Sequence, residues 1–386
     1  MRVGFGVTVL ARGLASGGVD GIGSYTRELM KRFSAAPGLD LLPLSYGPAL
    51  PPQAGGNATL QCGRFARAAA LAALSGLPFP GAGRLGGKID LMHATDHLIP
   101  NLGRVPVVAT LMDAIPLAHP EWVSWRFKAL KNALWRRTAH WAAHVITISE
   151  HSRQEIETHF AVPAEKISVV PLGVDERWFA PLAAEEMART LRRHALPEKF
   201  FLFVGTLQPR KNIGRVIQAH RSLPPGIANE IPLVIVGRPG WQCEDIVAAL
   251  ATGSYGKSII WLKYLPDDAL LAVVKAALAL VFPSLCEGFG LPVLEAFAAG
   301  TPVITSNTTS LPEVAGDAAL LVDPLDTEAI AAAMLRLAGD PGLADALRER
   351  GTARARAHSW DRTAAQTLAV YRRVLEQSGR SPRQAQ

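Results

Sequence analysis

Short apolar segments alternate with stretches of helical periodicity along nearly the whole chain. They form two sets of comparable size, one in each half of the 386 residues. The first set lies at residues 3–10, 41–45, 91–93, 105–111, 144–148 and 167–170. The second lies at residues 200–204, 232–236, 259–262, 279–282, 302–305 and 319–322. Strands that alternate with helices build parallel sheets with crossover helices. The sequence therefore predicts an α/β protein with two doubly wound, Rossmann-like domains.

A polar, proline-containing stretch near the middle of the chain separates the two sets. We expect one domain over residues 1–178 and a second over 179–361. Two such domains can form a cleft that holds two substrates separately and excludes water. The last helix, expected to begin near Trp360, carries Leu368, Tyr371 and Leu375 at helical spacing and needs an apolar surface to cover.

The composition is that of a globular protein, with 49% apolar and 19% charged residues. Cys62, Cys243 and Cys286 are far apart and include no C-x-x-C pair, so neither a disulfide framework nor a zinc site is indicated. The apolar start is short and interrupted by glycine, which favours a first strand over a signal peptide, and no apolar run is long enough to span a membrane. We expect a cytoplasmic protein.

Positive charge is concentrated in the first half and the tail. Residues 1–180 contain 18 Lys and Arg against 13 Asp and Glu, and residues 362–386 contain 5 against 1. A domain made of both parts would favour an anionic membrane surface or a phosphate-bearing acceptor. Without a Lys/Arg run or an aromatic RNA-binding motif, nucleic acid is not expected as a partner.

Two glutamates, Glu287 and Glu295, are separated by a glycine-bracketed turn and a helix start. Gly288 and Gly290 allow the backbone to approach a ligand, and Pro292 suits the first residue of a helix whose free amides face an anion. Carboxylates are also strong acceptors for sugar hydroxyls. The alternative is that Glu295 complements the helix dipole and Glu287 is only solvated.

A second polar motif follows the strand at 200–204. Gly205 comes first, and Arg210 and Lys211 follow, with Asn212 suited to cap the next helix. At the carboxyl edge of a parallel sheet these cations could neutralise a leaving diphosphate, although two surface cations are the alternative. No Asp-x-Asp pair is present to bind a metal, so we expect metal-independent chemistry without a cofactor.

The first half has its own candidates. A glycine-rich segment containing Gly21 and Gly23 opens a helix, and it lacks the G-x-G-x-x-G spacing of dehydrogenases. Asp113 follows the strand at 105–111. We also expect a basic helix over 124–145 with Trp135 opposite its core face, where it would meet either a membrane interface or solvent. The expected core face consists of Phe127, Leu130, Leu134, Trp141 and Val145.

The segments 203–212 (FVGTLQPRKN), 283–296 (PSLCEGFGLPVLEA), 298–304 (AAGTPVI) and 311–324 (LPEVAGDAALLVDP) resemble the retaining nucleotide-sugar glycosyltransferases of family four, or group 1. The resemblance covers nearly the whole chain. It implies the GT-B fold, in which two Rossmann-like domains face a cleft and the final helix, residues 362–386 here, crosses back to the N-terminal domain.

The resemblance also implies roles for the donor-side residues. Arg210 and Lys211 match the diphosphate-binding pair. Glu295 matches the carboxylate that holds the ribose, and Glu287 matches the one near the transferred sugar. The matching backbone amides are those of Phe289, Gly290 and Leu291.

On the acceptor side, Gly21 and Gly23 match the glycine-rich segment, and His93 lies where an acceptor-facing histidine is common. Many relatives have a histidine where this chain has Met112. A thioether cannot exchange protons, so the departing phosphate would take the acceptor proton while Asp113 positions the hydroxyl.

The expected function is therefore transfer of a hexose, with mannose favoured, from GDP-mannose or a UDP-sugar to a glycan or lipid-linked acceptor. The setting would be polysaccharide or lipopolysaccharide synthesis at the inner face of the cell membrane. Two alternatives stay open, namely a nucleotide-sugar epimerase on the same fold and a non-catalytic sugar-nucleotide binding subunit.

Overall fold

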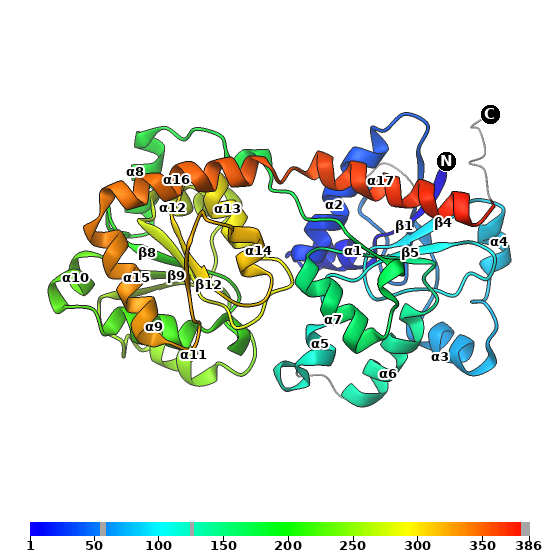
Figure 1. Ribbon diagram of the computed structural model, residues 1–386, viewed down its shortest axis with the longest axis horizontal. Coiled ribbons are helices and arrows are strands. Elements are labelled where there is room, and N and C mark those ends of the chain that lie inside the picture. Colours follow the sequence, from blue (N-terminus) through cyan, green and yellow to red (C-terminus); the bar gives the residue numbers. More distant parts are fainter. Residues whose placement is uncertain (55–58, 124–126, 380–386) are drawn as a thin grey trace. The chain divides into compact units, whose positions relative to one another are not determined.

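The computed structural model describes residues 1–54, 59–123 and 127–379, and the chain divides into two compact units (Figure 1). Unit 1 comprises Met1–Gly173 and Trp360–Gln386, and unit 2 comprises Val174–Ser359. These divisions fall a few residues before the expected boundaries at 178/179 and 361/362. The predicted α/β class with two Rossmann-like domains is confirmed.

Unit 1 is built on a parallel sheet of seven strands in the order β3-β2-β1-β4-β5-β6-β7. The strands are β1 (Arg2–Gly6), β2 (Asp40–Ser45), β3 (Leu60–Gln61), β4 (Leu91–Ala94), β5 (Val107–Thr110), β6 (His144–Thr147) and β7 (Ile167–Val169). The strand order reverses between β1 and β4. Ligands of doubly wound sheets bind beside the carboxyl ends of the strands at such a reversal.

Helices cover both faces of this sheet (Figure 1). They are α1 (Thr8–Ala15), α2 (Gly21–Ser34), α3 (Phe65–Ser75), α4 (Ala82–Gly86), α5 (Ile115–Ala118), α6 (Lys128–Ala139), α7 (Glu150–Phe160) and α17 (Trp360–Gln377). Short 3-10 turns lie at Pro52–Ala54, Pro120–Trp122 and Ala164–Lys166.

The final helix, α17, packs on unit 1 against α2, as the resemblance implied. Its buried face includes Tyr371 and Leu375, two of the three residues expected there, whereas Leu368 is half-buried. The Tyr371 hydroxyl lies 2.5 Å from Nδ1 of His93 on β4, and Nε2 of His93 lies 2.8 Å from the Thr110 hydroxyl on β5. The carboxyl-terminal segment is thus joined to the centre of the first sheet through buried polar groups.

Unit 2 contains a parallel sheet of six strands in the order β10-β9-β8-β11-β12-β13. The strands are β8 (Phe201–Val204), β9 (Leu233–Val236), β10 (Ile259–Leu262), β11 (Ala279–Phe282), β12 (Val303–Ser306) and β13 (Leu320–Val322). The helices are α8 (Ala184–Arg193), α9 (Ile213–Arg221), α10 (Pro225–Glu230), α11 (Glu244–Ala251), α12 (Asp267–Ala276), α13 (Leu291–Ala299), α14 (Leu311–Ala315), α15 (Thr327–Gly339) and α16 (Pro341–Arg356). Two 3-10 turns, η4 (Glu176–Trp178) and η5 (Pro209–Lys211), complete the unit. Its order reverses between β8 and β11, the two strands that carry the donor-side motifs.

Two sequence predictions in unit 1 were wrong. The first strand ends at Gly6, and the apolar residues after it belong to α1, with Leu10 buried on that helix. On the basic helix α6, Trp135 faces the core, whereas Leu134 of the expected core face is only partly buried and Val145 belongs to β6. Trp135 is 5% exposed, whereas Phe127 and Leu130 are 77% and 73% exposed. Residues 124–126 of the expected helix lie outside the described residues.

Within the described ranges, no helix combines the length and apolarity needed to cross a bilayer.

Candidate functional site

The donor-side motifs of unit 2 meet at the point where its strand order reverses. The chain leaves β8 at Gly205 and forms the turn η5, while the loop after β11 carries Glu287 into the first turn of α13. The Leu285 amide donates to the Arg210 carbonyl at 2.8 Å, which holds the loop against η5. Motifs about 75 residues apart in sequence are thereby brought together, because the carboxyl ends of adjacent parallel strands share one edge of the sheet.

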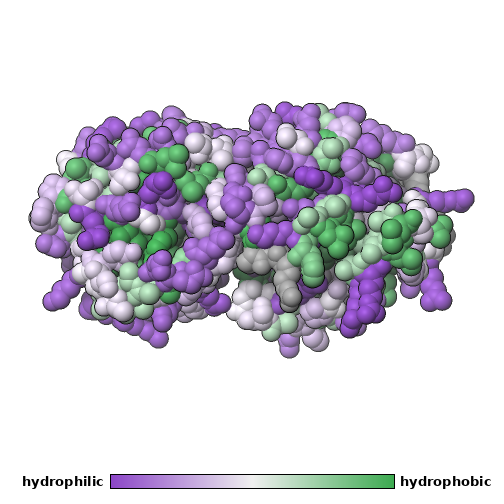
Figure 2. Space-filling model, turned by 90° about the horizontal axis from the view of Figure 1, so that it is seen from below, coloured by the Kyte–Doolittle hydropathy of each residue, from purple (hydrophilic) through white to green (hydrophobic). Residues whose placement is uncertain are grey.

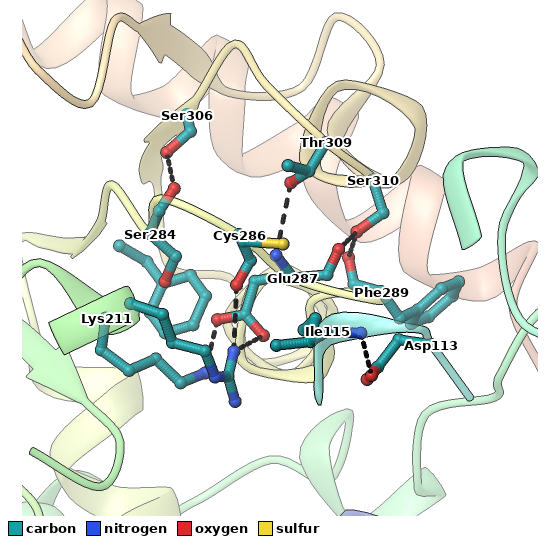
Figure 3. A network of polar contacts seen from close by, with 12 residues as sticks. Asp113, Ile115, Lys211, Ser284, Cys286, Glu287, Phe289, Ser306, Thr309 and Ser310 are labelled. Atoms are coloured by element: carbon teal, nitrogen blue, oxygen red, sulfur yellow. Dashed lines mark hydrogen bonds and ion pairs between the residues drawn. The ribbon is translucent and has the colours of Figure 1, made fainter. Parts of the chain in front are cut away.

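Glu287 is paired with both predicted cations (Figure 3). Its Oε2 accepts from Arg210 at 2.7 Å, and its Oε1 accepts from Lys211 Nζ at 2.5 Å. Arg210 also donates to the Cys286 carbonyl at 3.0 Å. Glu287 and Lys211 are each 7% exposed. One carboxylate thus faces two cations, so this cluster keeps a net positive charge that suits a phosphate group.

The buried surroundings shift the proton affinities of this cluster. Burial lowers the pKa of Lys211 to about 8, even though Glu287 acts in the opposite direction. Burial alone would raise the pKa of Glu287, but the charges of Lys211 and Arg210 outweigh it and lower that pKa. Glu287 is therefore ionised at neutral pH. The Lys211 ammonium also lies 4.6 Å from the centre of the Phe282 ring on β11.

Backbone carbonyls of the Glu287 loop are held by a serine that the sequence prediction missed. The buried Ser310 hydroxyl lies 2.8 Å from the Glu287 carbonyl and 2.9 Å from the Phe289 carbonyl (Figure 3). Its neighbour Thr309 accepts from the Glu287 amide at 3.4 Å and adopts a φ of 59°. Only the position of Ser310 two residues before Pro312 was available as a signal, and such a spacing is not specific.

The helix α13 begins at Leu291, one residue before the expected start at Pro292. Gly290 precedes the helix with a φ of 119°, and a Cβ there would come within 2.7 Å of Leu311 Cδ2, so a side chain would be strained and crowded. Among the described residues, none accepts a hydrogen bond from the amides of Phe289, Gly290 or Leu291. Those amides are available to an anionic or hydroxyl-bearing ligand.

Gly205 and Asn212 flank the two cations. A Cβ on Gly205 would lie 3.8 Å from Lys211 Cε, which places this glycine beside the cluster. Asn212 was predicted to cap α9 through its side chain, and this was wrong. It adopts a φ of 61°, and its Nδ2 donates to the carbonyls of Pro283 and Pro324 at 2.9 and 2.7 Å. Asn212 therefore ties the loops after β11 and β13 to the turn that carries Arg210.

Glu295 lies in a separate charge cluster. It is half-buried on α13, and the charges that act on it are those of Arg177, Asp267 and Asp175. Burial raises the pKa of Glu295 to about 7, while Arg177 acts to lower it. Arg177 donates to Asp267 at 2.6 Å. The glutamates of the motif thus differ, since Glu287 is fully paired and Glu295 is near its titration point at neutral pH.

Two buried oxygens near the donor-side cluster have no hydrogen-bond partner among the described residues. They are Oε1 of Gln208, which precedes η5, and Oγ of Ser284, which follows β11. Buried polar atoms are normally satisfied, so a ligand or water is expected to reach them. No group of three or more His, Cys, Asp or Glu side chains in the described part of the chain is arranged to hold a metal ion.

Unit 1 has a cavity of about 200 Å³ at the carboxyl ends of β4 and β5. Asp113 and Met112 line it, together with Asp96 and His97. Burial raises the pKa of Asp96 to about 6, and burial lowers the pKa of His97 to about 3. The ring of His97 packs 3.9 Å from that of Trp135, which the sequence had placed outside the core. This cavity presents carboxylates and an aromatic ring, groups that suit a hydroxyl-rich ligand.

The remaining acceptor-side candidates do not line this cavity themselves, although Ile22, which lies between Gly21 and Gly23, does. His93 is fully buried, and both ring nitrogens are engaged by Tyr371 and Thr110, which favours a place in the core over contact with a substrate. Gly21 and Gly23 lie in the first turn of α2. A Cβ on Gly23 would come within 2.7 Å of Val19, so this glycine allows the turn to pack closely. Gly21 faces open space.

Two parallel sheets, each with polar groups at its point of reversal, define a doubly wound α/β protein. Models of two protein families identify the class more closely. "Glycosyltransferase Family 4" matches residues 19–178, and "Glycosyl transferases group 1" matches residues 188–354.

Relatives agree with these models. The chain is 37% identical over 229 residues to O-antigen chain mannosyltransferase B of Escherichia coli, an alignment that spans 59% of this chain and 60% of that protein. It is 31% identical over 309 residues to the MMP α-(1→4)-mannosyltransferase of Mycolicibacterium hassiacum, spanning 75% of this chain and 72% of that protein. The chain therefore belongs to the group 1, family 4 glycosyltransferases.

Solved structures share the fold. Anabaena Alr3699/HepE in complex with UDP-glucose superposes with a TM-score of 0.74 at 16% identity, covering 96% of this chain and 99% of that one. This likeness confirms the predicted GT-B class of fold.

Proposed function

We propose that this glycosyltransferase transfers a hexose, with mannose favoured, from a nucleoside diphosphate sugar to a glycan or lipid-linked saccharide. GDP-mannose is the favoured donor and a UDP-sugar is the second candidate. Transfer occurs with retention and without a metal or cofactor. The product belongs to a cell-surface polysaccharide or lipopolysaccharide, made in the cytoplasm at the inner face of the membrane.

The observation that carries this proposal is the cluster of Arg210, Lys211 and Glu287 at the strand reversal of unit 2. The two cations would neutralise the pyrophosphate as the glycosidic bond breaks. Glu287 would meet the transferred sugar, and the amides of Phe289 to Leu291 would bind its hydroxyls or the phosphate. Glu295 would hold the ribose in its ionised form. Mannose is favoured because two relatives are named mannosyltransferases.

On the acceptor side, the cavity lined by Asp113 in unit 1 would receive the hydroxyl that attacks. Asp113 would position this hydroxyl. Since Met112 cannot take a proton, the departing phosphate would accept it while the new bond forms on the same face of the sugar.

A thermal-shift screen of the full chain with UDP-, GDP- and ADP-sugars tests the donor site. A matching donor should raise the melting temperature, and the rise should be lost in Arg210→Ala and in Glu295→Ala. Arg193→Ala, at an exposed arginine on α8, is the matched control and should respond like the wild type. Equal responses in all variants, or no response in the wild type, would refute the donor-site assignment.

Product analysis tests the chemistry. With donor, a saccharide acceptor and EDTA, we expect transfer and an anomeric NMR coupling that shows retention. Conversion of the donor sugar without an acceptor would instead identify an epimerase. Donor binding without hydrolysis or transfer over a panel of acceptors would identify a binding subunit.

A further inference from the structure

A second cavity in unit 1 lies between β3, α3 and α4, and it shares no lining residue with the cavity that contains Asp113. Its volume is about 690 Å³. Cavities of this size typically receive small-molecule ligands. Neither the family resemblance nor the proposed reaction assigns it a role.

The rim of this cavity is strongly basic. Arg64 and Arg67 come from the start of α3, Arg84 comes from α4, and Lys88 follows α4. All four are exposed, and none forms an ion pair within the described residues. No carboxylate is among the side chains that line the cavity in the described part of the chain. Four cations without a counterion create a positive potential that attracts an anion.

The floor of the cavity is apolar and aromatic. Tyr46, Phe79 and Leu85 are 9%, 5% and 9% exposed, and the Tyr46 and Phe79 rings pack 6.2 Å apart. Leu71, which lines the cavity, is 58% exposed, and Leu74, one helical turn further along α3 and outside the lining, is 89% exposed. In Figure 2, hydrophobic side chains gather beside hydrophilic ones on the face where α3 and α6 lie. Exposed apolar residues of this kind usually mark an interaction surface.

A basic rim over an apolar floor matches a ligand with a negative head and a hydrocarbon chain. We propose that this cavity binds an anionic membrane lipid and so docks unit 1 on a bilayer. The lipid phosphate lies among Arg64, Arg67, Arg84 and Lys88, its chain covers Tyr46 and Phe79, and Leu71 and Leu74 enter the interface. This lipid site is independent of the donor site in unit 2, and it does not depend on the identity of the transferred sugar.

Cys62 offers a direct reporter of occupancy. It lines the cavity and is half-buried, whereas Cys243 and Cys286 are buried at 6% and 4% exposure. Burial raises the pKa of the Cys62 thiol, so labelling with a maleimide is measured above neutral pH. Mass spectrometry gives the rate at Cys62, and Cys62→Ser identifies the labelled site.

The probe is a short-chain phosphatidylglycerol, kept monomeric below its critical micelle concentration. It should slow the labelling of Cys62 several-fold, whereas phosphatidylcholine of equal chain length and inorganic phosphate should not. Protection by phosphate alone, equal protection by both lipids, or no protection by phosphatidylglycerol would each overturn the proposal.

Vesicle flotation tests the docking itself. The full chain should float with vesicles containing phosphatidylglycerol and not with pure phosphatidylcholine. Arg64→Glu/Arg67→Glu should reduce binding by at least about tenfold and abolish the protection of Cys62. Arg192→Glu/Arg193→Glu on α8 of unit 2 makes the same change in charge at exposed arginines and should do neither. If both double variants lost vesicle binding equally, the net charge of the protein would explain the loss, and the lipid site would be refuted. The donor-induced thermal shift reports on unit 2, so failure of the proposed donor site and failure of the proposed lipid site can be distinguished.

Discussion

Replacing Glu287 by glutamine removes the carboxylate that pairs with both Arg210 and Lys211. Lys211 and Glu287 are each 7% exposed, so solvent cannot replace the lost partner. Breaking a buried ion pair from one side typically costs about 3–5 kcal/mol. Lys211 can also avoid an unpaired buried charge by releasing its proton. For an unfolded-state pKa near 10.4, this release costs about 5 kcal/mol at pH 7, which is the upper limit of the loss in stability. We therefore expect Glu287→Gln to lower the free energy of unfolding by about 3–5 kcal/mol at pH 7.

The pH dependence of this loss has a definite sign. Burial already lowers the pKa of Lys211 to about 8, and without Glu287 this pKa falls further. Between the lower pKa of the variant and pH 8, the folded variant binds fewer protons than its unfolded chain, so its stability rises with pH. The wild type changes little in that interval. The deficit of the variant should therefore shrink from pH 7 towards pH 8.

The stabilisation that a bound nucleotide provides should increase in this variant, although the variant alone is less stable. Because the variant lacks the carboxylate that accepts from both Arg210 and Lys211, a nucleoside diphosphate supplies the missing negative charge and should stabilise Glu287→Gln more than the wild type. Urea denaturation and thermal shifts, each with and without the nucleotide, measure both effects. The matched control is Glu230→Gln, because Glu230 is 63% exposed in its contact with Lys199 and should change stability by less than about 1 kcal/mol. A variant as stable as the wild type, with no larger response to nucleotide, would refute this account of the cluster.

Three further substitutions separate the roles of other buried groups. Burial raises the folded-state pKa of Asp96 from 3.8 to about 6. Between these pH values the folded state binds more protons than the unfolded chain, so the wild type loses stability as pH rises. Asp96→Asn should therefore be more stable than the wild type by up to about 3 kcal/mol above pH 6 and equally stable below pH 3.8. An equal gain at both pH values in urea denaturation would contradict this. Ser310→Ala removes the one hydroxyl proton that two buried carbonyls share and should lower stability by about 1–3 kcal/mol and weaken donor binding, measured by calorimetry, while Ser378→Ala, at a helix end, should change neither. Tyr371→Phe removes the hydrogen bond to His93 and should cost about 1 kcal/mol while leaving the donor-induced thermal shift intact; loss of that shift would show that α17 affects the donor site.

The sequence predicted the strands better than the ends of the helices. Each apolar run marked a real strand, because most strands of a sheet covered on both faces are buried; β10 and β13 are only partly buried. The strand β3 was not predicted because its two residues are too few to show an apolar pattern. The first strand was extended too far because Val7, Val9 and Leu10 are apolar in either conformation, and the switch to α1 depends on burial in the assembled unit.

The donor-side cluster was partly predictable. Glycines, adjacent cations and spaced carboxylates are visible as residue types, and the topology then brings them together. The pairing of Glu287 with both cations was not visible, because it depends on the positions of two loops about 75 residues apart. The hydrogen bond from Ser310 to the Glu287 carbonyl and those from Asn212 to Pro283 and Pro324 could not be predicted for the same reason. Trp135 was misplaced because its helix carries large apolar residues on both faces, and tertiary contacts, including the one with His97, determine which face is buried.

The ends of unit 2 meet. Val174 and Ser359 form a parallel bridge, and the Val174 amide donates to the His358 carbonyl at 3.0 Å. Unit 2 thus has the form of an inserted cassette whose entry and exit are neighbours. The polypeptide of residues 174–359 has its two ends side by side, so it can be inserted into a loop of an unrelated host protein without a spacer.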